Sequence, residues 1–356
     1  NGSTALMLAA RWGGEHGAGM MRALLEHPDV AVDAQDDDGW TALMFAAKYG
    51  GEDATGMMRS LAEHGDVAAN KQQQNGWTAL MVAARNGGEH GAGMMRALLT
   101  ADADVNVQND YRRTALMYAA RDGGKHAEAM MRALTGAGAA VNAQDCEGFT
   151  ALMLAARWGA EHAEAMMRAL LGAGAAVDAR DNWGQTALML AAVHGNEHFE
   201  AMMRMLIDAG ADANQQSNSG RTALMIAARR GGAHFEATMR VLIEAGADAN
   251  TQDKSGWTAL MVAVGFEHGA GMMRALVDAG ADPNKQSNAG STALMFAVQK
   301  KKHGAGMMRL LLSAGADPNK QAKNGETALM VAARKGGEQH AEGMVRLLVA
   351  HGATLP

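Results

Sequence analysis

The chain of 356 residues contains few of the residues that staple or interrupt a fold. A single cysteine, Cys146, excludes a disulfide within the chain. There are 4 prolines, and aromatic residues make up only 4% although 48% of the residues are hydrophobic. The core must therefore be built from Ala, Leu, Met and Val, a composition typical of closely packed helices.

The sequence also lacks an excess of basic residues and any long apolar run. Its formal net charge is −6, whereas non-specific binding to phosphate backbones requires a basic surface, so we expect no nucleic-acid partner. No apolar stretch reaches the ~18 residues of a membrane-spanning helix, so we expect no membrane insertion. The sequence does not identify a compartment: the cytoplasm is favoured, and an extracellular location is the alternative for a processed fibre subunit.

Glycine, in contrast, is abundant with 44 residues, which predicts turns at short intervals. The tetrapeptide Thr-Ala-Leu-Met recurs along the whole chain. Its threonines are Thr4, Thr41, Thr78, Thr114, Thr150, Thr186, Thr222, Thr258, Thr292 and Thr327. They lie 34 to 37 residues apart, a period typical of a solenoid whose units are too small to bury their own apolar faces. The period predicts one array of repeats instead of several globular domains.

The copy that begins at Thr78 shows the pattern of one repeat. Thr78 is a good helix N-cap, and Leu80 and Ala83 follow it on one apolar face. After a glycine break at residues 87–88, residues 94–99 form a second apolar stripe at helical spacing. The polar, turn-rich stretch that follows predicts a hairpin-like loop. Each repeat is therefore expected to hold two short helices and a loop.

The recurring pattern GxTALMxAAxxGG…MMRxLLxxGADxNxQ resembles the ankyrin repeat, with TALM in place of the usual TPLH. The resemblance covers the chain in ten copies. It implies an all-α, helix-turn-helix solenoid with hairpin-like loops, arranged as a curved, right-angled stack. The predicted repeats are residues 2–38, 39–75, 76–111, 112–147, 148–183, 184–219, 220–255, 256–289, 290–324 and 325–356.

Two features depart from the pattern. Most copies carry about three extra residues between the glycine break and the second helix, as at residues 89–93, and we expect them to lengthen either the turn or the start of the second helix without changing the stack. Arg112 stands where the other loops have glycine, so we expect a distorted loop tip in that repeat.

Nine repeats place a histidine four residues before the position of the first methionine of the second helix, a position that Thr238 occupies in one of them. These are His16, His90, His126, His162, His198, His234, His268, His303 and His340. Metal ligands must lie about 2 Å from one ion, whereas neighbouring helices of a stack lie roughly 8–10 Å apart. We therefore expect no metal site, and we interpret each histidine as capping or packing the start of the second helix.

The positions that vary between repeats indicate where a partner would bind, because the stack itself dictates the recurring ones. They lie just before the cap threonine and at the end of the first helix, and in proteins that this chain resembles they line a concave groove. Trp, Tyr and Arg are frequent anchors of protein interfaces. The predicted partner-binding residues, in the concave groove and at the loop tips, are Trp12, Trp40, Tyr49, Trp77, Arg113, Phe149, Trp158, Arg221, Arg230 and Trp257.

Catalysis is not expected, and neither is a cofactor. Cys146 lies at a predicted loop tip with no column histidine near it in the repeat, and no nucleophile, base and orienting group come together. The resemblance therefore implies a non-enzymatic scaffold that binds a protein partner of unknown identity through its concave face.

The alternative function is structural. The first and last repeats keep apolar second helices, for example Leu24 and Leu347, although the ends of a soluble solenoid are normally polar. Either the chain is part of a longer array, or its ends bury each other in a head-to-tail polymer, because a contact that does not close on itself produces a filament.

Overall fold

The computed structural model describes residues 2–65, 67–193, 197–229, 233–266, 269–300, 303–334 and 339–354, apart from the side chains of residues 160, 197–199, 233–235 and 339–341. Within these residues the chain is helical and has no strands, so the all-α prediction is confirmed. The chain divides into two compact units, Asn1–Asn182 (unit 1) and Trp183–Pro356 (unit 2). We describe each unit by itself.

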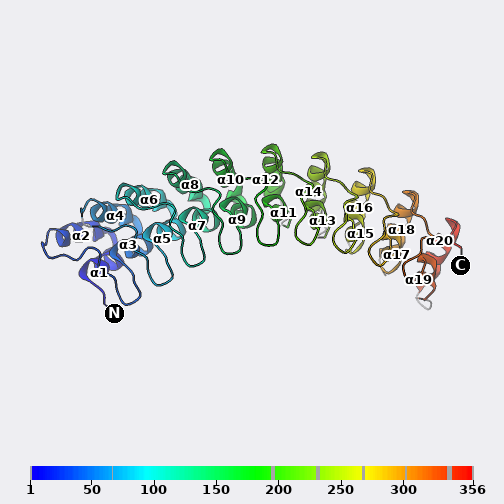
Figure 1. Cartoon of the computed structure of the whole chain (residues 1–356), viewed down its shortest axis with the longest axis horizontal. Helices are drawn as coiled ribbons and strands as arrows, with labels where there is room; N and C mark the ends of the chain where they lie inside the picture. The colour runs from blue at the N-terminus through cyan, green and yellow to red at the C-terminus, as the bar shows by residue number, and fades with distance from the viewer. Residues whose placement is uncertain are drawn as a thin grey trace. The chain divides into compact units, whose positions relative to one another are not determined.

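Unit 1 consists of α-helix pairs whose members are joined by one turn of 3-10 helix (Figure 1). The first helices are α1 (Ala5–Trp12), α3 (Ala42–Tyr49), α5 (Ala79–Asn86), α7 (Ala115–Asp122) and α9 (Ala151–Trp158). The second helices are α2 (Gly17–Leu25), α4 (Ala54–Ala62), α6 (Gly91–Thr100), α8 (Ala127–Gly136) and α10 (Ala163–Gly172). The 3-10 turns are η1 (Gly14–His16), η2 (Gly51–Asp53), η3 (Gly88–His90), η4 (Gly124–His126) and η5 (Ala160–His162). The extra residues of the repeat thus lengthen the turn, one of the two predicted outcomes.

Unit 2 has the same pairs with shorter first helices, and its described residues include no 3-10 turn. The first helices are α11 (Ala187–Ala191), α13 (Ala223–Ala228), α15 (Ala259–Val264), α17 (Ala293–Val298) and α19 (Ala328–Arg334). The second helices are α12 (Glu197–Asp208), α14 (Ala233–Glu244), α16 (Gly269–Asp278), α18 (Gly304–Ser313) and α20 (Gln339–Ala350). In each unit the first helices pack side by side in one row and the second helices in another, while the loops extend from the first-helix row (Figure 1).

Each first helix begins at the recurring threonine. The hydroxyl of Thr78, for example, accepts a hydrogen bond from the backbone N–H of Met81 at 3.4 Å, and Thr78 itself is buried. The same bond recurs in every repeat at 3.3–3.4 Å. Such a cap contributes about 1 kcal/mol, and here it satisfies a backbone donor that has no helical partner.

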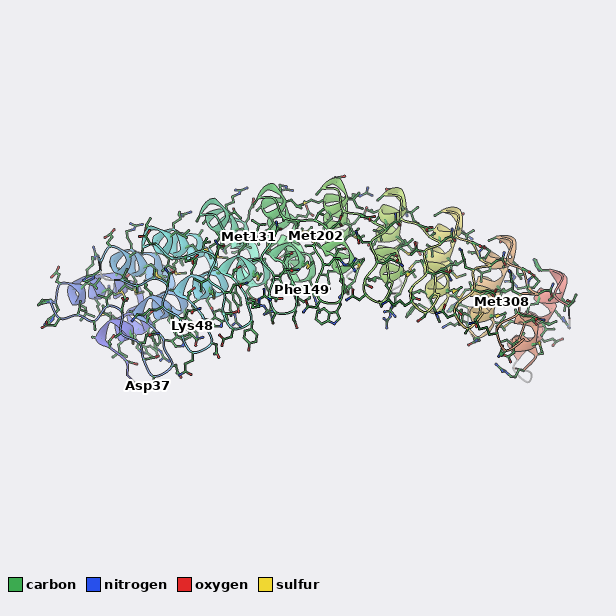
Figure 2. All side chains as sticks on the ribbon, viewed as in Figure 1. Asp37, Lys48, Met131, Phe149, Met202 and Met308 are labelled. Carbon is green, nitrogen blue, oxygen red and sulfur yellow. The ribbon has the colours of Figure 1, made fainter. Side chains whose placement is uncertain are left out.

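Methionine, leucine and alanine fill the space between the two helix rows. Met131 on α8 and Met202 on α12 are fully buried, as is Met308 on α18 (Figure 2). Glycine at the start of a second helix permits this packing: a Cβ on Gly17 would lie 2.6 Å from the Sδ of Met57 in the next repeat. A glycine as the first residue of a second helix therefore permits close contact with a methionine of the next repeat, as at Gly17 and Gly91.

Polar side chains join each loop to the next within a unit. The amide of Gln72 donates to the carbonyl of Gly76 in its own loop and to the carbonyl of Gln108 in the next. Asn106 accepts from the N–H of Ala140 at 2.6 Å and donates to the carbonyl of Gly138. These bonds join a side chain of one loop to the backbone of the next. They fix the register of neighbouring loops and do not depend on which side chains the next loop carries.

The loop tip at Arg112 is not distorted, contrary to expectation. Arg112 adopts φ 57°, the left-handed backbone that Gly76 and Gly148 adopt at the equivalent tips with φ 77° and 82°. Its N–H donates to the carbonyl of Asn109 at 2.7 Å, which matches the bond from Gly76 to Gln73 at 2.8 Å. The repeat therefore imposes its turn on a residue with a Cβ, at a cost in backbone strain.

The column histidines whose side chains the structure describes occupy the N-cap position of the second helix, but the expected capping bond is absent. The side chains of His16, His90, His126, His162 and His303 make no cap hydrogen bond. Those of His198, His234, His268 and His340 lie outside the described side chains. The described residues also include no group of three or more His, Cys, Asp or Glu side chains suited to a metal ion.

The ten repeat boundaries predicted from the sequence are retained as a proposal. The recurrence of the threonine cap and of the inter-loop hydrogen bonds within each unit supports them.

Candidate functional site

Each repeat has one side chain at the C-terminal end of its first helix that takes part in the proposed surface. It is the residue seven positions after the cap threonine, and we call this series the helix-end column. In unit 1 the column is basic throughout: Arg11, Lys48, Arg85, Arg121 and Arg157. The sequence analysis did not identify this series, although the recurring Ala-Ala-Arg triplet is a direct signal for it.

The basic side chains of unit 1 lie over aromatic rings. The guanidinium carbon of Arg157 is 4.4 Å from the ring centroid of Trp158, and that of Arg85 is 5.4 Å from Trp77. The ammonium of Lys48 is 4.8 Å from the ring centroid of Trp40. Such cation–π contacts contribute about 0.5–1 kcal/mol at exposed sites, so they orient the cations without neutralising them.

Few carboxylates compensate these charges. Asp122 lies 3.9 Å from Arg85 and 3.8 Å from Arg121. Within the described part of the chain, no carboxylate lies within 4 Å of the charged groups of Arg11, Lys48 or Arg157. The first-helix face of unit 1 therefore carries a local excess of positive charge on a chain of net negative charge.

A small cavity lies between two of these cations. It measures about 350 Å³ and is lined by Trp40 and Trp77 together with Lys48, Val82 and Arg85. Both tryptophans are half-buried and packed against other rings, since the centroid of Trp77 lies 4.3 Å from that of Tyr118 and that of Trp40 lies 5.4 Å from that of Phe45. The walls of this cavity are thus held in place.

The helix-end column of unit 2 has a different composition: Val193, Arg229, Gly265, Gln299 and Arg334. There a larger cavity of about 1240 Å³ opens, lined by Val193, Gly265 and Arg229. The exposed rings of Trp183 and Phe266 also line it. Because valine is short and glycine has no side chain, the space that a long basic residue would cover in unit 1 is left open here.

The structure places most of the predicted partner-binding residues at accessible positions. Trp12 is 73% exposed, Tyr49 41% and Trp158 40%. Trp40 and Trp77 are half-buried in the walls of the small cavity. Trp257 and Arg221 line the large cavity of unit 2, and Arg221 lies 3.9 Å from Asp253. Arg230 lies outside the described residues.

Two of the predicted residues are engaged inside the protein. Phe149 is 0% exposed and packs edge-on against Trp158 at 5.8 Å, so it presents no surface to a partner in this structure. Arg113 is mostly buried and donates to Asp145 at 3.0 Å. Burial lowers the pKa of Arg113, but the hydrogen bond and charge of Asp145 outweigh burial, and the net shift is upward. The Arg113 side chain joins its own loop to the next one and Phe149 packs inside its own repeat, which the pattern of variable positions did not reveal.

The stacked helix pairs, each capped by a threonine and joined by hydrogen-bonded loops, define a helical repeat protein. The family model for ankyrin repeats (three copies) matches the chain in overlapping segments, residues 1–65, 54–144, 89–181, 116–215, 160–253, 196–287, 232–322 and 267–355. The chain therefore belongs to the ankyrin-repeat family, and the predicted resemblance is confirmed. A search of curated proteins found no match.

Membership of this family indicates a protein-interaction scaffold, and its members are generally non-enzymatic. In the part of the chain that the structure describes, none of the helices has both the length and the apolarity to cross a bilayer.

Proposed function

We propose that this protein is a non-enzymatic scaffold that binds a protein partner through its concave groove, the surface formed by the first helices and the adjoining loops. The observation that carries the proposal is the row of aromatic and cationic side chains on the first helices of unit 1, where Trp12, Tyr49 and Trp158 keep 40% or more of their surface exposed.

The physical reason is that water-exposed aromatic surface is costly unless a partner covers it. Large rings bury much area on binding and lose few torsions, so Trp and Tyr contribute disproportionately to interface energy. Cation–π contacts already hold these rings: Arg11 lies 5.0 Å from the Trp12 centroid and 5.3 Å from the Tyr49 centroid. A surface that is organised before binding loses little entropy when a partner arrives.

A selection from a display library of random peptides against the intact chain tests the proposal. Peptides that depend on the groove should lose binding to a Trp40→Ala, Trp77→Ala double variant. The matched control replaces two cations of the second helices, Arg59→Gln and Arg96→Gln, and should retain them. If the selected peptides bind the tryptophan double variant as well as the wild-type chain, the proposed groove is wrong, provided that circular dichroism shows the variant folded.

A second candidate function is end-to-end self-association. Leu8 is 49% exposed, whereas Phe45 and Val82 at the same position of the next repeats are 7% and 2% exposed. Val349 in the last repeat is 55% exposed. A second copy stacked on either end would bury this surface. Sedimentation velocity should then show growth with concentration that Leu8→Glu abolishes, and a chain that stays monomeric at high concentration would remove this candidate.

A further inference from the structure

We infer that the first-helix face of unit 1 selects an acidic, extended segment of its protein partner. This inference rests on the proposed function and deepens it, because it names the chemistry that the groove recognises. It is carried by the helix-end column of unit 1, Arg11, Lys48, Arg85, Arg121 and Arg157, which is basic in every repeat.

The first argument is charge complementarity. Asp122 is the carboxylate that pairs with this column in the described chain, and it lies near the edge of the ion-pair range from Arg85 and Arg121. The other basic side chains of the column rest on aromatic rings. A ring attracts a cation by its quadrupole and leaves the net charge in place. The surface therefore presents uncompensated positive charge to a partner.

The second argument is spacing. Neighbouring helices in a stack lie roughly 8–10 Å apart, and an extended chain advances ~3.3 Å per residue. An extended segment that runs along the first helices therefore meets a new cation about every third residue. We expect the recognised sequence to carry Asp or Glu at every third position, with apolar side chains between them to cover the exposed rings.

The cavity between Lys48 and Arg85 provides the best-formed subsite. Its volume of about 350 Å³ and its walls of Trp40 and Trp77 suit one side chain with an apolar stem and a charged end. Glutamate has this shape: its methylenes would contact the rings, and its carboxylate would lie between the two cations. The packing of Trp77 against Tyr118, with ring centroids 4.3 Å apart, holds the wall in place, so the subsite exists before the partner binds.

Unit 2 provides an internal contrast. Its helix-end column has Val193, Gly265 and Gln299 at positions that are basic in unit 1. No two neighbouring repeats of unit 2 therefore both have a basic residue in this column. Its large cavity is lined by rings and short side chains together with Arg221 and Arg229, and Arg221 lies 3.9 Å from Asp253. The acidic segment is therefore expected to bind unit 1.

A protein segment fits better than a nucleic acid. A polynucleotide carries charge at every residue and is repelled by a chain of net charge −6, whereas a segment with spaced carboxylates needs only the local cations. The experiment includes an oligonucleotide so that this alternative counts against the inference.

The test measures binding by fluorescence anisotropy, using the intact chain and a labelled peptide of about fifteen residues, long enough for roughly five repeats. The peptide carries Glu at every third position and Leu or Ser elsewhere. A control peptide carries Gln in place of each Glu. We expect the Glu peptide to bind and the Gln peptide to bind at least about tenfold more weakly. Affinity for the Glu peptide should fall as salt is raised.

The double variant Lys48→Gln, Arg85→Gln should weaken binding of the Glu peptide about tenfold. The matched control, Arg59→Gln with Arg96→Gln, removes the same charge from the second helices of the same repeats and should bind like the wild-type chain. Equal losses in both double variants would show non-specific attraction and overturn the inference.

Three further outcomes separate the inference from the proposed function. If both peptides bind equally and both lose binding to Trp40→Ala with Trp77→Ala, the groove binds peptides but does not select acids, and the inference alone fails. If neither peptide binds while library peptides do so through the groove, the inference again fails alone. If a single-stranded oligonucleotide binds more tightly than the Glu peptide in the same buffer, the partner class is wrong.

Discussion

Units 1 and 2 share the threonine caps and the methionine-filled core, and they differ in the helix-end column as well as in the length of the first helices. In both, a threonine caps the first helix and methionines such as Met131 and Met308 fill the core. Seven residues after the threonine, unit 1 has a basic residue in every repeat, whereas unit 2 has valine, glycine and glutamine at three positions. One surface becomes a row of cations over rings, and the other becomes a cavity of about 1240 Å³.

The difference shows how a repeat protein separates stability from recognition. Buried columns must recur because each repeat packs against its neighbours, and a change there leaves a void or a clash. The helix-end column has one side in water, so its residues are free to change without altering the stack. Four predictions test this comparison, from the largest expected effect to the smallest.

If the framework is the same in both units, a core truncation should cost the same in each. Met131→Ala in unit 1 and Met308→Ala in unit 2 remove fully buried side chains, and each should lower the free energy of unfolding by about 2–5 kcal/mol. Urea denaturation followed by circular dichroism measures both. If the two losses of unfolding free energy differ by more than about 2 kcal/mol, the two cores are packed differently. The difference between the units could then not be assigned to the helix-end column alone.

The cavity of unit 2 should bind a neutral apolar probe, and the face of unit 1 should contribute little to this binding. Replacing Trp183 and Phe266 by Ala removes two exposed rings that line the cavity, and it should weaken the binding of Nile red about tenfold. Lys48→Gln should leave the affinity unchanged. The same loss in the Lys48 variant would contradict the division of chemistry between the units.

Unit 1 contains one strained loop tip, and the described equivalent tips of unit 2 have glycine, as at Gly220 and Gly256. Arg112→Gly should therefore stabilise the protein by up to about 1 kcal/mol, because glycine adopts a positive φ without strain. The reverse test is Gly76→Ala, which should destabilise it, since the new Cβ would lie 2.9 Å from the Cα of Asn109. Both are measured by denaturant unfolding, and an unchanged midpoint for Arg112→Gly would refute the strain.

The smallest effect concerns the ring stacks of the two units, Trp77 on Tyr118 and Trp257 on Phe296. Burial raises the pKa of the Tyr118 phenol above its usual 10.0, although the bond from Asn109 opposes the shift. A raised pKa favours the neutral phenol in the folded state, so this contribution to stability is complete below pH 10.0 and is lost as the pH rises through the folded-state pKa.

Tyr118→Phe should therefore reduce the loss of stability between about pH 8 and about pH 11, as measured by urea unfolding at each pH. The phenylalanine at the equivalent position of unit 2 has no proton to lose, so Phe296→Leu serves as the control and should leave the pH dependence unchanged. An identical pH profile for Tyr118→Phe and the wild-type chain would contradict the assignment.

Much of this protein could be predicted from local sequence alone. The spacing of the threonines and the apolar faces that follow them predict the helix pairs, because a cap and a period of 3.6 residues are local properties. Trp40 and Trp77 stand at two of the variable positions and line the small cavity, and their role in binding a partner stays a prediction.

Other features required the tertiary structure. Phe149 and Arg113 occupy variable positions, yet Phe149 is buried against Trp158 and Arg113 is paired with Asp145 of the next loop. Arg112 keeps a left-handed turn because hydrogen bonds of the loop override its local preference. The basic column was visible as a repeated triplet, but its contact with the rings depends on distances between helices.

The sequence by itself determined the repeat, its helices and its family, since these follow from short-range periodicity and capping. Only the tertiary structure decided which variable side chains reach water, which cations lie over rings, and where a cavity opens. The reason is that exposure and charge compensation depend on the neighbouring repeat, about 36 residues away along the chain and roughly 8–10 Å away in space.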